Sequence, residues 1–270
     1  MNATIRMPAV AGRFYYGQAQ ALEQEIDGYT RAAGEKLSAF GCIVPHAGYL
    51  YSGHVAGAVY ARLELPRRFI IIGPNHTGMG KALAIMSEGE WATPLGKARV
   101  DTALAEALKH DYDLLSEDTA AHLREHALEV QLPFLQRLAP DFSFVPIAIG
   151  TGRYEVLEEL GVALAGVLAE AGDPVLVIAS SDMNHYESDE VTRIKDKRAL
   201  QPILQLDPRG LFDVVMRQHV SMCGFGPAIV MLTAAKIRGA THAELIRYAT
   251  SGDINGERGK VVGYAGVAVS

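Results

Sequence analysis

Three apolar, strand-like runs in this chain each end in a short turn that carries a histidine. The histidines, each with the run before it, are His46 (40–45), His76 (68–73) and His185 (175–179). In an open α/β sheet, ligands bind at the carboxyl ends of the strands. Side chains that can bind a metal follow several of these strands, which predicts one shared site at that edge. A cysteine turn, which holds Cys223, adds a fourth candidate.

Strand-like runs alternate with helical patterns over most of the 270 residues. This alternation predicts one α/β domain, spanning residues 1–270, with helices on both faces of a sheet. The predicted strands are 40–45, 68–73, 83–86, 142–149, 175–179, 243–250 and 261–269. The predicted helices are 18–34, 53–64, 101–110, 118–132, 154–171, 189–206, 209–218 and 227–238. A polar hairpin loop joins the last two strands, so we expect antiparallel strands there and a mixed sheet.

Composition excludes several classes of function. The net charge of −6 and the pI of about 5.8 give no basic footprint for nucleic acid. No apolar run approaches 18 residues, so no membrane span is predicted, and residues 1–8 lack the apolar core of a signal peptide. The two cysteines, Cys42 and Cys223, form no disulfide framework. A reducing cytoplasm is therefore the expected compartment.

Familiar nucleotide-binding and nucleophile motifs are absent. No P-loop and no G-x-G-x-x-G after the first strand occurs. No G-x-S-x-G elbow occurs either, which makes Ser180 and Ser181 weak nucleophile candidates. We expect both serines to hydrogen-bond within their turn.

The metal-ligand candidates are two histidines and one cysteine. Small residues follow His46, so a ligand can approach the backbone closely. His76 repeats this arrangement at the next strand end, and the matching pair favours ligands over structural histidines. Neutral imidazole suits iron, zinc and copper. A thiolate at Cys223 would complete a three-ligand site, although a free cysteine is also a common buried apolar residue.

Two further pairs are candidates for proton transfer or for supporting the ligands. Asp182 and His185 share one turn, where they could ligate, move a proton or hold an oxyanion; alternatively Asp182 caps a helix and His185 is a surface residue. His126 and Glu129 are three apart on the predicted helix 118–132, so they would share one face. There they would line the pocket or hydrogen-bond a ligand histidine, or simply face solvent.

Tyrosines near glycines form the last group of candidates. Tyr49 and Tyr51 follow the His46 turn directly, and Tyr15 and Tyr16 stand near the start of the chain. They either wall a pocket or pack in the core.

Taken in order, these motifs are similar to those of the Memo family, whose fold resembles that of the class III extradiol ring-cleavage dioxygenases. The matching stretches run through essentially the whole chain. They are Pro45-His46-Ala47-Gly48-Tyr49 with Tyr51 and Gly53, Gly73-Pro74-Asn75-His76, Glu125-His126-Ala127-Leu128-Glu129 with Leu132-Pro133, Ser180-Ser181-Asp182 with His185, Cys223-Gly224, and Gly263-Tyr264-Ala265-Gly266.

The resemblance implies a metal held at His46, His76 and Cys223, with His185 as acid/base and Asp182 beside it. The dioxygenases complete their iron site with a glutamate, and Cys223 stands in its place. A thiolate is softer than a carboxylate, so iron is expected first and copper or zinc are alternatives.

The leading expectation is a metal-dependent, non-haem redox enzyme that acts on a small-molecule substrate. The alternatives are a non-catalytic metal- or peptide-binding signalling protein and a zinc-dependent hydrolase. The resemblance also implies a radical-SAM protein as a partner.

Overall fold

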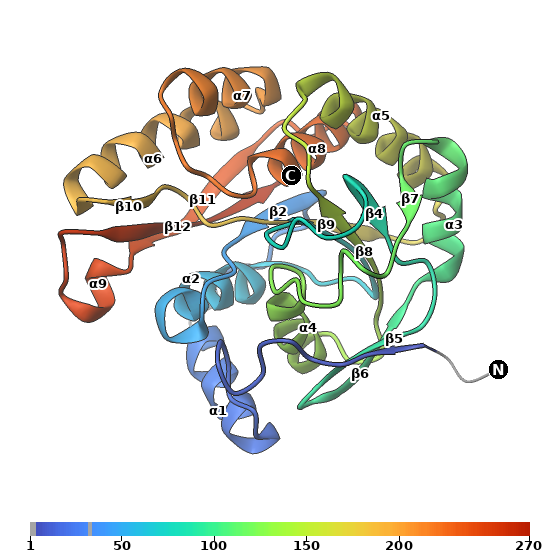
Figure 1. Cartoon of the computed structure of the whole chain (residues 1–270), viewed down its shortest axis with the longest axis horizontal. Helices are drawn as coiled ribbons and strands as arrows, with labels where there is room; N and C mark the ends of the chain where they lie inside the picture. Colours follow the sequence, from blue (N-terminus) through green and yellow to red (C-terminus); the bar gives the residue numbers. More distant parts are fainter. Residues whose placement is uncertain (1–3, 32–33) are drawn as a thin grey trace.

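The apolar, β-branched runs form the centre of the sheet and pair in parallel. Side by side lie β2 (Gly41–Val44), β9 (Val175–Ser180), β3 (Arg68–Pro74) and β8 (Ser143–Ile149). Nearly all of their residues are buried, as in parallel sheets that helices cover on both faces. The computed structural model describes residues 4–31 and 34–270, and every strand in that part belongs to one twelve-stranded sheet (Figure 1).

Antiparallel strands extend this centre. β12 (Val261–Val269) pairs antiparallel with β2 and with β11 (Ala243–Thr250), so the predicted C-terminal hairpin is confirmed. The short helix α9 (Gly252–Asn255) lies in its loop. The remaining strands are β1 (Ile5–Arg6), β4 (Leu83–Ile85), β5 (Glu90–Thr93), β6 (Gly96–Val100), β7 (Ser116–Glu117) and β10 (His185–Glu187). The predicted fold class, α/β with a mixed sheet between helices, is confirmed.

Helices cover both faces of the sheet (Figure 1). One face is covered by α1 (Ala19–Thr30), α2 (Tyr49–Arg62) and α4 (Leu132–Leu138). The other is covered by α3 (Thr102–Asp111), α5 (Tyr154–Glu170), α6 (Asp189–Leu204), α7 (Pro208–Arg217) and α8 (Phe225–Ile237). Within the described residues, no helix has both the length and the apolar character needed to cross a membrane.

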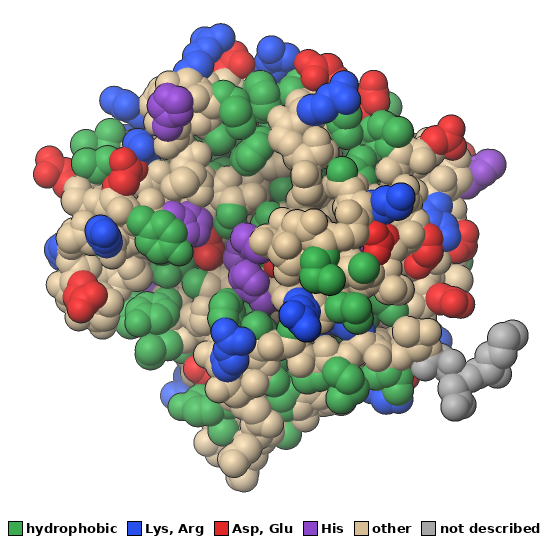
Figure 2. Space-filling view, in the orientation of Figure 1, with side chains coloured by type: hydrophobic (Ala, Val, Ile, Leu, Met, Phe, Trp, Pro, Cys, Tyr) green, Lys and Arg blue, Asp and Glu red, His purple; other side chains and the backbone are tan. Residues whose placement is uncertain are grey.

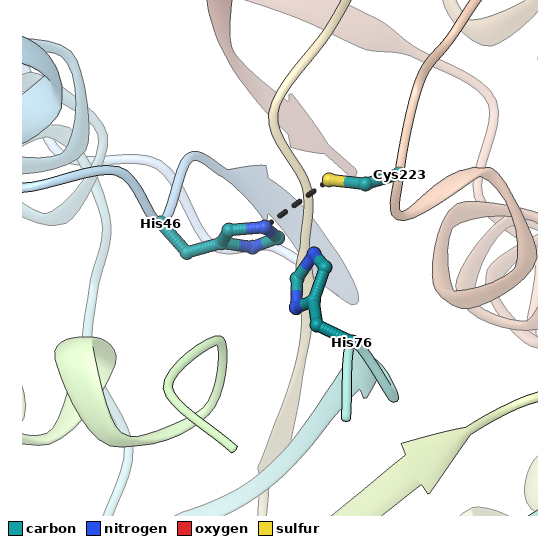
Figure 3. Close-up of side chains that lie close together, drawn as sticks. All are labelled: His46, His76 and Cys223. Carbon is teal, nitrogen blue, oxygen red and sulfur yellow. Dashed lines mark hydrogen bonds between the residues drawn. The ribbon is translucent and has the colours of Figure 1, made fainter. Parts of the chain in front are cut away.

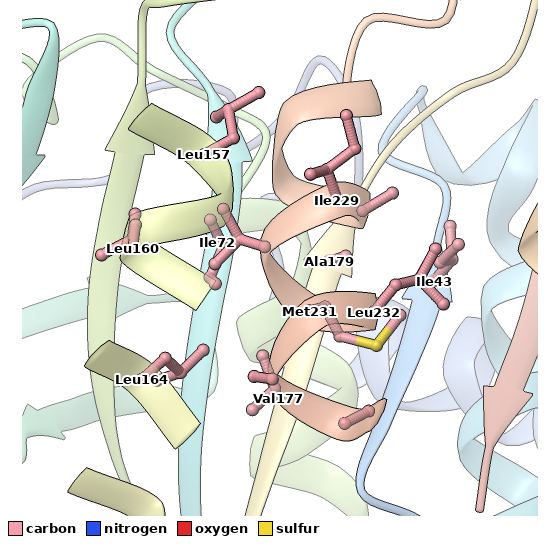
Figure 4. Close-up of a cluster of buried hydrophobic side chains, with 14 of the residues drawn as sticks. Ile43, Ile72, Leu157, Leu160, Leu164, Val177, Ala179, Ile229, Met231 and Leu232 are labelled. Atoms are coloured by element: carbon pink, nitrogen blue, oxygen red, sulfur yellow. The ribbon is translucent and has the colours of Figure 1, made fainter. Parts of the chain in front are cut away.

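The alternation of side chains along the strands separates two cores. Ile70 and Ile72 of β3 belong to the core under α5 and α8, whereas Phe69 and Ile71 belong to the core under α1, α2 and α4. Figure 4 shows the first of these, where leucines of α5 and apolar residues of α8 lie over the central strands. Burial on both faces fixes the strand ends that carry the candidate residues.

The predicted helix 118–132 is wrong. Residues 118–128 form turns, followed by a single 3-10 turn, η1 (Glu129–Gln131), and then α4. The carboxylates of Asp118 and Glu125 accept hydrogen bonds from backbone N–H groups one to three residues further on, which competes with helix formation. Pro133 lies in the first turn of α4, where proline is tolerated.

A proline inside a predicted strand, here Pro146 in 142–149, indicates an edge strand or a bulge, and this expectation is also wrong. β8 is an interior strand that pairs with β3 along its whole length. On its other side β8 pairs first with β6, up to Phe144, and then with β4, from Ile147 onward. Pro146 falls between these two partners, so its missing N–H removes no bond from either ladder.

Most element boundaries lie within a few residues of the predictions, and α2 begins four residues early, at Tyr49. Two expectations fall partly on residues outside the described part of the chain. These are the segment 1–8, at residues 1–3, and the helix 18–34, at residues 32–33.

His122 is fully buried in the turns between β7 and η1. Its ring lies edge-on to Trp91, with ring centroids 5.6 Å apart. Neither ring nitrogen has a hydrogen-bond partner among the described residues. Burial, followed by the nearby Arg6 cation, lowers the pKa of His122 to about 4, while the charges of Asp118, Glu125 and Glu117 act in the opposite direction. His122 is therefore neutral in the folded protein at neutral pH.

We expect His122 to make the protein sensitive to acid. In the unfolded chain its pKa is about 6.5, so between pH 6.5 and 4 the unfolded state binds more protons. Stability is then lost as the pH falls through this window, by about 3 kcal/mol in total. The variant His122→Phe should show a correspondingly flatter pH dependence in urea unfolding between pH 7.5 and 4.5. Parallel curves for the two proteins would rule out this role.

Candidate metal centre

His46 lies two residues after Val44, the last residue of β2, and its relative exposure is 1%. Its backbone N–H donates to Asp182 Oδ1 at 2.8 Å, and that of Ala47 to the same oxygen at 3.3 Å. These bonds hold the turn after β2 against the turn after β9, which is its parallel neighbour. The strand pairing therefore fixes the backbone of His46.

The hydrogen bonds around Ser180 decide which nitrogen of His46 carries the proton. The Ser180 hydroxyl donates to Ala127 O at 2.6 Å and accepts from Gln131 Nε2 at 2.9 Å. Ser180 Oγ lies 2.9 Å from His46 Nδ1, and its second lone pair is available for that contact. Since the hydroxyl proton is already used, Nδ1–H of His46 must be the donor. Nε2 of His46 therefore keeps a lone pair.

Glu125 fixes the second histidine in the same way. His76 follows β3, and its Nδ1 lies 2.9 Å from Glu125 Oε1. The other carboxylate oxygen accepts the backbone N–H of His76 at 2.6 Å. Burial alone would raise the pKa of Glu125, but the bonds from His76 and from the Ala127 N–H keep this pKa below its ordinary value. An ionised Glu125 accepts Nδ1–H and leaves Nε2 of His76 with a lone pair.

Cys223 reaches the two histidines from the loop that precedes α8. Its Sγ lies 3.1 Å from His46 Nε2 (Figure 3). Burial, followed by the Asp182 charge, raises the pKa of the Cys223 thiol. Burial also holds the pKa of His46 well below its usual value, with His126 and His76 acting in the same direction. Without a cation, the pair is a neutral thiol that donates to a neutral imidazole.

The three donor atoms fit one metal ion. Nε2 of His46, Nε2 of His76 and Sγ of Cys223 come from different segments and converge (Figure 3), and a ligand atom of each lies within 4.8 Å of the others. A tetrahedral site with ordinary metal–nitrogen and metal–sulfur bonds places such atoms roughly 3.3–3.6 Å apart. Small side-chain movements would bring the three donor atoms from their present separations to this spacing. Three protein ligands also leave at least one open position.

Gly224 allows the cysteine loop to approach the turn after β9. Its N–H donates to Ser181 Oγ at 3.0 Å. A Cβ atom at Gly224 would lie 2.3 Å from Ser180 O and 2.4 Å from Ser181 Cβ, which is too close for any side chain. The position of Cys223 therefore depends on the absence of a side chain at the next residue.

We expect Gly224→Ala to weaken metal binding and to lower stability by about 1–3 kcal/mol, because the loop must move away from the sheet. Gly226→Ala is the matched control. Its added Cβ would meet only the tips of two side chains, Leu157 at 3.3 Å and Ile149 at 3.5 Å. Metal titration and urea unfolding of both variants test this, and equal metal affinity in the two would contradict it.

Asp182 and His185 lie beside the three candidate ligands. Asp182 is buried, which raises its pKa, and its Oδ1 is used by the turn that holds His46. His185 Nδ1 lies 2.9 Å from the carbonyl oxygen of Ser221, which can only accept. His185 Nδ1 is therefore protonated, and its Nε2 is the nitrogen that can take up and release a proton. Ser221 stands two residues before Cys223, so this bond holds His185 against the loop that carries the cysteine.

The ring of His126 lies against the two candidate ligand histidines, although no helix carries it. Its ring stacks on that of His76, with centroids 4.6 Å apart, and meets His46 edge-on at 5.5 Å. Phe14 covers it from the N-terminal segment, at 4.8 Å. His76, Glu125 and His126 also form a second group of possible ligands, but the Glu125 oxygens are already used by N–H donors.

The structure does not bring the other predicted residues to this group. Glu129 points to the opposite side, where it accepts from Tyr15 OH at 2.6 Å. It shares no helix face with His126. Tyr49 is buried, and its hydroxyl donates to Val130 O at 2.6 Å, so it belongs to the core. Tyr51 is half-buried and packs against a small cluster that includes Tyr264.

Sequence reasoning missed three residues that orient the histidines. Ser180 and Gln131 orient His46, and Glu125 orients His76. Glu125 was visible only as part of a matching stretch. The signal that could have found it is an acidic residue directly before a pocket histidine in otherwise apolar surroundings.

The candidate centre is partly open to solvent, since the His76 side chain is 33% exposed. Figure 2 shows histidine side chains in a hollow near the middle of one face, flanked by apolar side chains. In the same orientation, Figure 1 looks onto the loops that follow the parallel strands. A small molecule could enter from this side.

Comparisons with known proteins give the same family over nearly the whole chain. A family model described as "Memo-like protein" matches residues 6–268. A MEMO1 family protein of Methanothermobacter thermautotrophicus is 40% identical over 273 residues, which covers 97% of this chain and 99% of that protein. MEMO1 family proteins of Pyrobaculum aerophilum and Methanosarcina mazei are each 42% identical, covering 97% and 98% of this chain and 98% and 99% of their own lengths.

A solved structure gives a likeness of fold alone. The crystal structure of the uncharacterized protein JW3007 from Escherichia coli K12 has a TM-score of 0.54 and 14% sequence identity. The match covers 84% of this chain and 98% of that one.

Proposed function

This chain belongs to the Memo family, and on that premise we propose that it is a metal-dependent redox protein, with iron as the first candidate metal. The observation that carries the proposal is the convergence of three donor atoms on one point. Hydrogen bonds to Ser180 and to Glu125 leave the lone pair of each histidine on Nε2, the nitrogen that faces the group. Orientation of a ligand histidine through its other ring nitrogen is a common feature of metal sites.

The residues beside the ligands suit proton transfer. A bound iron ion would supply redox chemistry at its open coordination positions. Ser221 fixes the tautomer of His185 through Nδ1, so its Nε2 can accept a proton from a substrate and return it. Asp182 keeps the His46 turn in place through its Oδ1.

A second candidate is a zinc-dependent hydrolase, which the cysteine favours. Zinc is bound well by two histidines and one thiolate, with a water in the open position. The residue roles would be the same, with His185 moving the proton of that water. The identity of the metal therefore separates the two candidates.

The test is anaerobic purification with metal analysis, followed by electron paramagnetic resonance and Mössbauer spectroscopy. We expect about one iron per chain and binding of oxygen analogues by the ferrous protein. Catechols with oxygen are the first substrates to assay, because the fold resemblance points to them. His185→Ala should retain the metal and lose roughly 10²–10⁴-fold in any turnover found. Zinc alone would favour the hydrolase, and absence of any metal affinity would favour a non-catalytic, peptide-binding protein.

A further inference from the structure

The N-terminal strand β1 contributes one buried cation, Arg6, to the surroundings of Glu125. Arg6 is 2% exposed, and its guanidinium stacks over Trp91 with Cζ 4.2 Å from the ring centroid. β1 pairs only with β5, at the edge of the sheet, as far as the described residues show. A buried arginine on a two-residue edge strand needs partners that offset its desolvation.

Those partners all lie in the segment 122–129, which comprises the turns that carry Glu125 and the first residue of η1. Arg6 Nε donates to His122 O at 2.9 Å, and Nη2 donates to Glu125 O at 2.6 Å. Nη1 makes an ion pair with Glu129 Oε2 at 2.5 Å. The planar guanidinium spans three acceptors at once, a geometry that the single ammonium group of lysine cannot reproduce.

Glu129 completes the connection from the other side. Besides Arg6, its carboxylate accepts from Ala9 N at 2.7 Å, from Val10 N at 3.0 Å and from the Tyr15 hydroxyl. The segment 6–15 and the segment 122–129 are therefore tied together by buried, charge-assisted bonds. Such bonds are stronger and more directional than neutral ones.

We propose that Arg6 is a positioning residue for the metal centre, acting on His76 through Glu125. This inference rests on the proposed metal site. Arg6 donates a hydrogen bond to the backbone carbonyl of Glu125. The carboxylate of Glu125 in turn accepts hydrogen bonds from the ring and from the backbone N–H of His76. A shift of that carbonyl shifts the carboxylate, and with it the direction of the His76 lone pair.

The test compares Arg6→Lys with a matched substitution far from the site. Arg68 likewise binds one carboxylate, Asp101 at 2.7 Å, and a backbone carbonyl, Ala171 O at 3.0 Å, which is one carbonyl fewer than Arg6 binds. It stands at the first residue of β3, whereas His76 follows the last. Arg68→Lys therefore removes a similar set of bonds without touching the turns that carry Glu125. Cobalt(II) is the probe, because its absorption bands report both affinity and coordination geometry.

We expect Arg6→Lys to bind cobalt(II) roughly tenfold more weakly, at the low end of the effect of groups that support metal ligands, and with altered ligand-field bands. Arg68→Lys should bind as the unchanged protein does. Equal binding by the two variants, whether both normal or both weakened, would overturn the proposal.

A second readout needs no metal. Hydrogen exchange of the amides in residues 122–128 should be faster in Arg6→Lys than in Arg68→Lys, because the turns lose their anchor. If the unchanged protein binds no cobalt, the proposed function fails, and unchanged exchange would then also overturn the positioning role. Should Arg6→Lys not fold, Tyr15→Phe removes one bond to Glu129 and keeps the ion pair. It must shift cobalt affinity in the same direction, and unchanged affinity would overturn the proposal.

Discussion

Replacing Cys223 with alanine should abolish stoichiometric metal binding while the protein stays folded. The side chain supplies the only thiol of the three-donor group that the described residues form, and its removal leaves two nitrogen donors. We expect the loss in affinity to exceed the roughly 10–100-fold effect that follows removal of a group that merely supports a ligand. Metal content after gel filtration and a competition titration with a chelator measure this effect.

Cys42→Ala is the matched control for this substitution. Cys42 is completely buried in β2, within the core under α1, α2 and α4. Its truncation should cost some stability and leave the metal content unchanged. Full metal retention by Cys223→Ala would instead transfer the third ligand position to Asp182 or His185.

Replacing Glu125 with glutamine should lower metal affinity roughly 10–100-fold. The Glu125 carboxylate accepts four N–H donors, three of them from the backbone, whereas an amide offers one acceptor and one donor group. At least one N–H group then faces the new amide NH₂. The His76 ring loses its fixed tautomer, and the variant should also be less stable, since a buried donor without a partner costs about 1–3 kcal/mol.

Asp101→Asn separates the two effects of the Glu125 substitution. Asp101 accepts from the Leu104 N–H, from Arg68 and from Ser143, away from the centre. This variant should lose stability and keep its affinity for cobalt(II). If Glu125→Gln binds cobalt as tightly as Asp101→Asn does, Glu125 does not orient a ligand.

The elements with strong patterns were predictable from the sequence. β3 and β9 are short, apolar and β-branched, and the long amphipathic α5 shows helical periodicity. The hairpin of β5 and β6 escaped prediction because its strands are short and carry charged residues. The turns at residues 118–128 were mistaken for a helix, since local carboxylate–backbone bonds leave no periodic signal.

The same contrast holds for the candidate site. His46, His76 and Cys223 were found because each type of side chain has its own chemistry and follows a readable turn. The roles of Glu125 and Glu129 were harder to predict, because the sequence does not show which partner an acidic side chain faces. Two glutamates four residues apart face opposite segments, Glu125 toward His76 and Glu129 toward Arg6. Only the three-dimensional course of the backbone assigns each one to its partner.

The three candidate ligands come from widely separated parts of the chain, and this has a consequence for biosynthesis. During translation the histidines emerge long before Cys223, and the turn that Gly224 contacts follows β9. A nascent chain therefore offers no complete set of donors until most of the sheet has paired. Metal loading would follow global folding, and a metal that binds only the folded chain then adds to its stability in proportion to the logarithm of metal concentration. Cellular metal supply would in this way influence how long each finished molecule survives proteolysis.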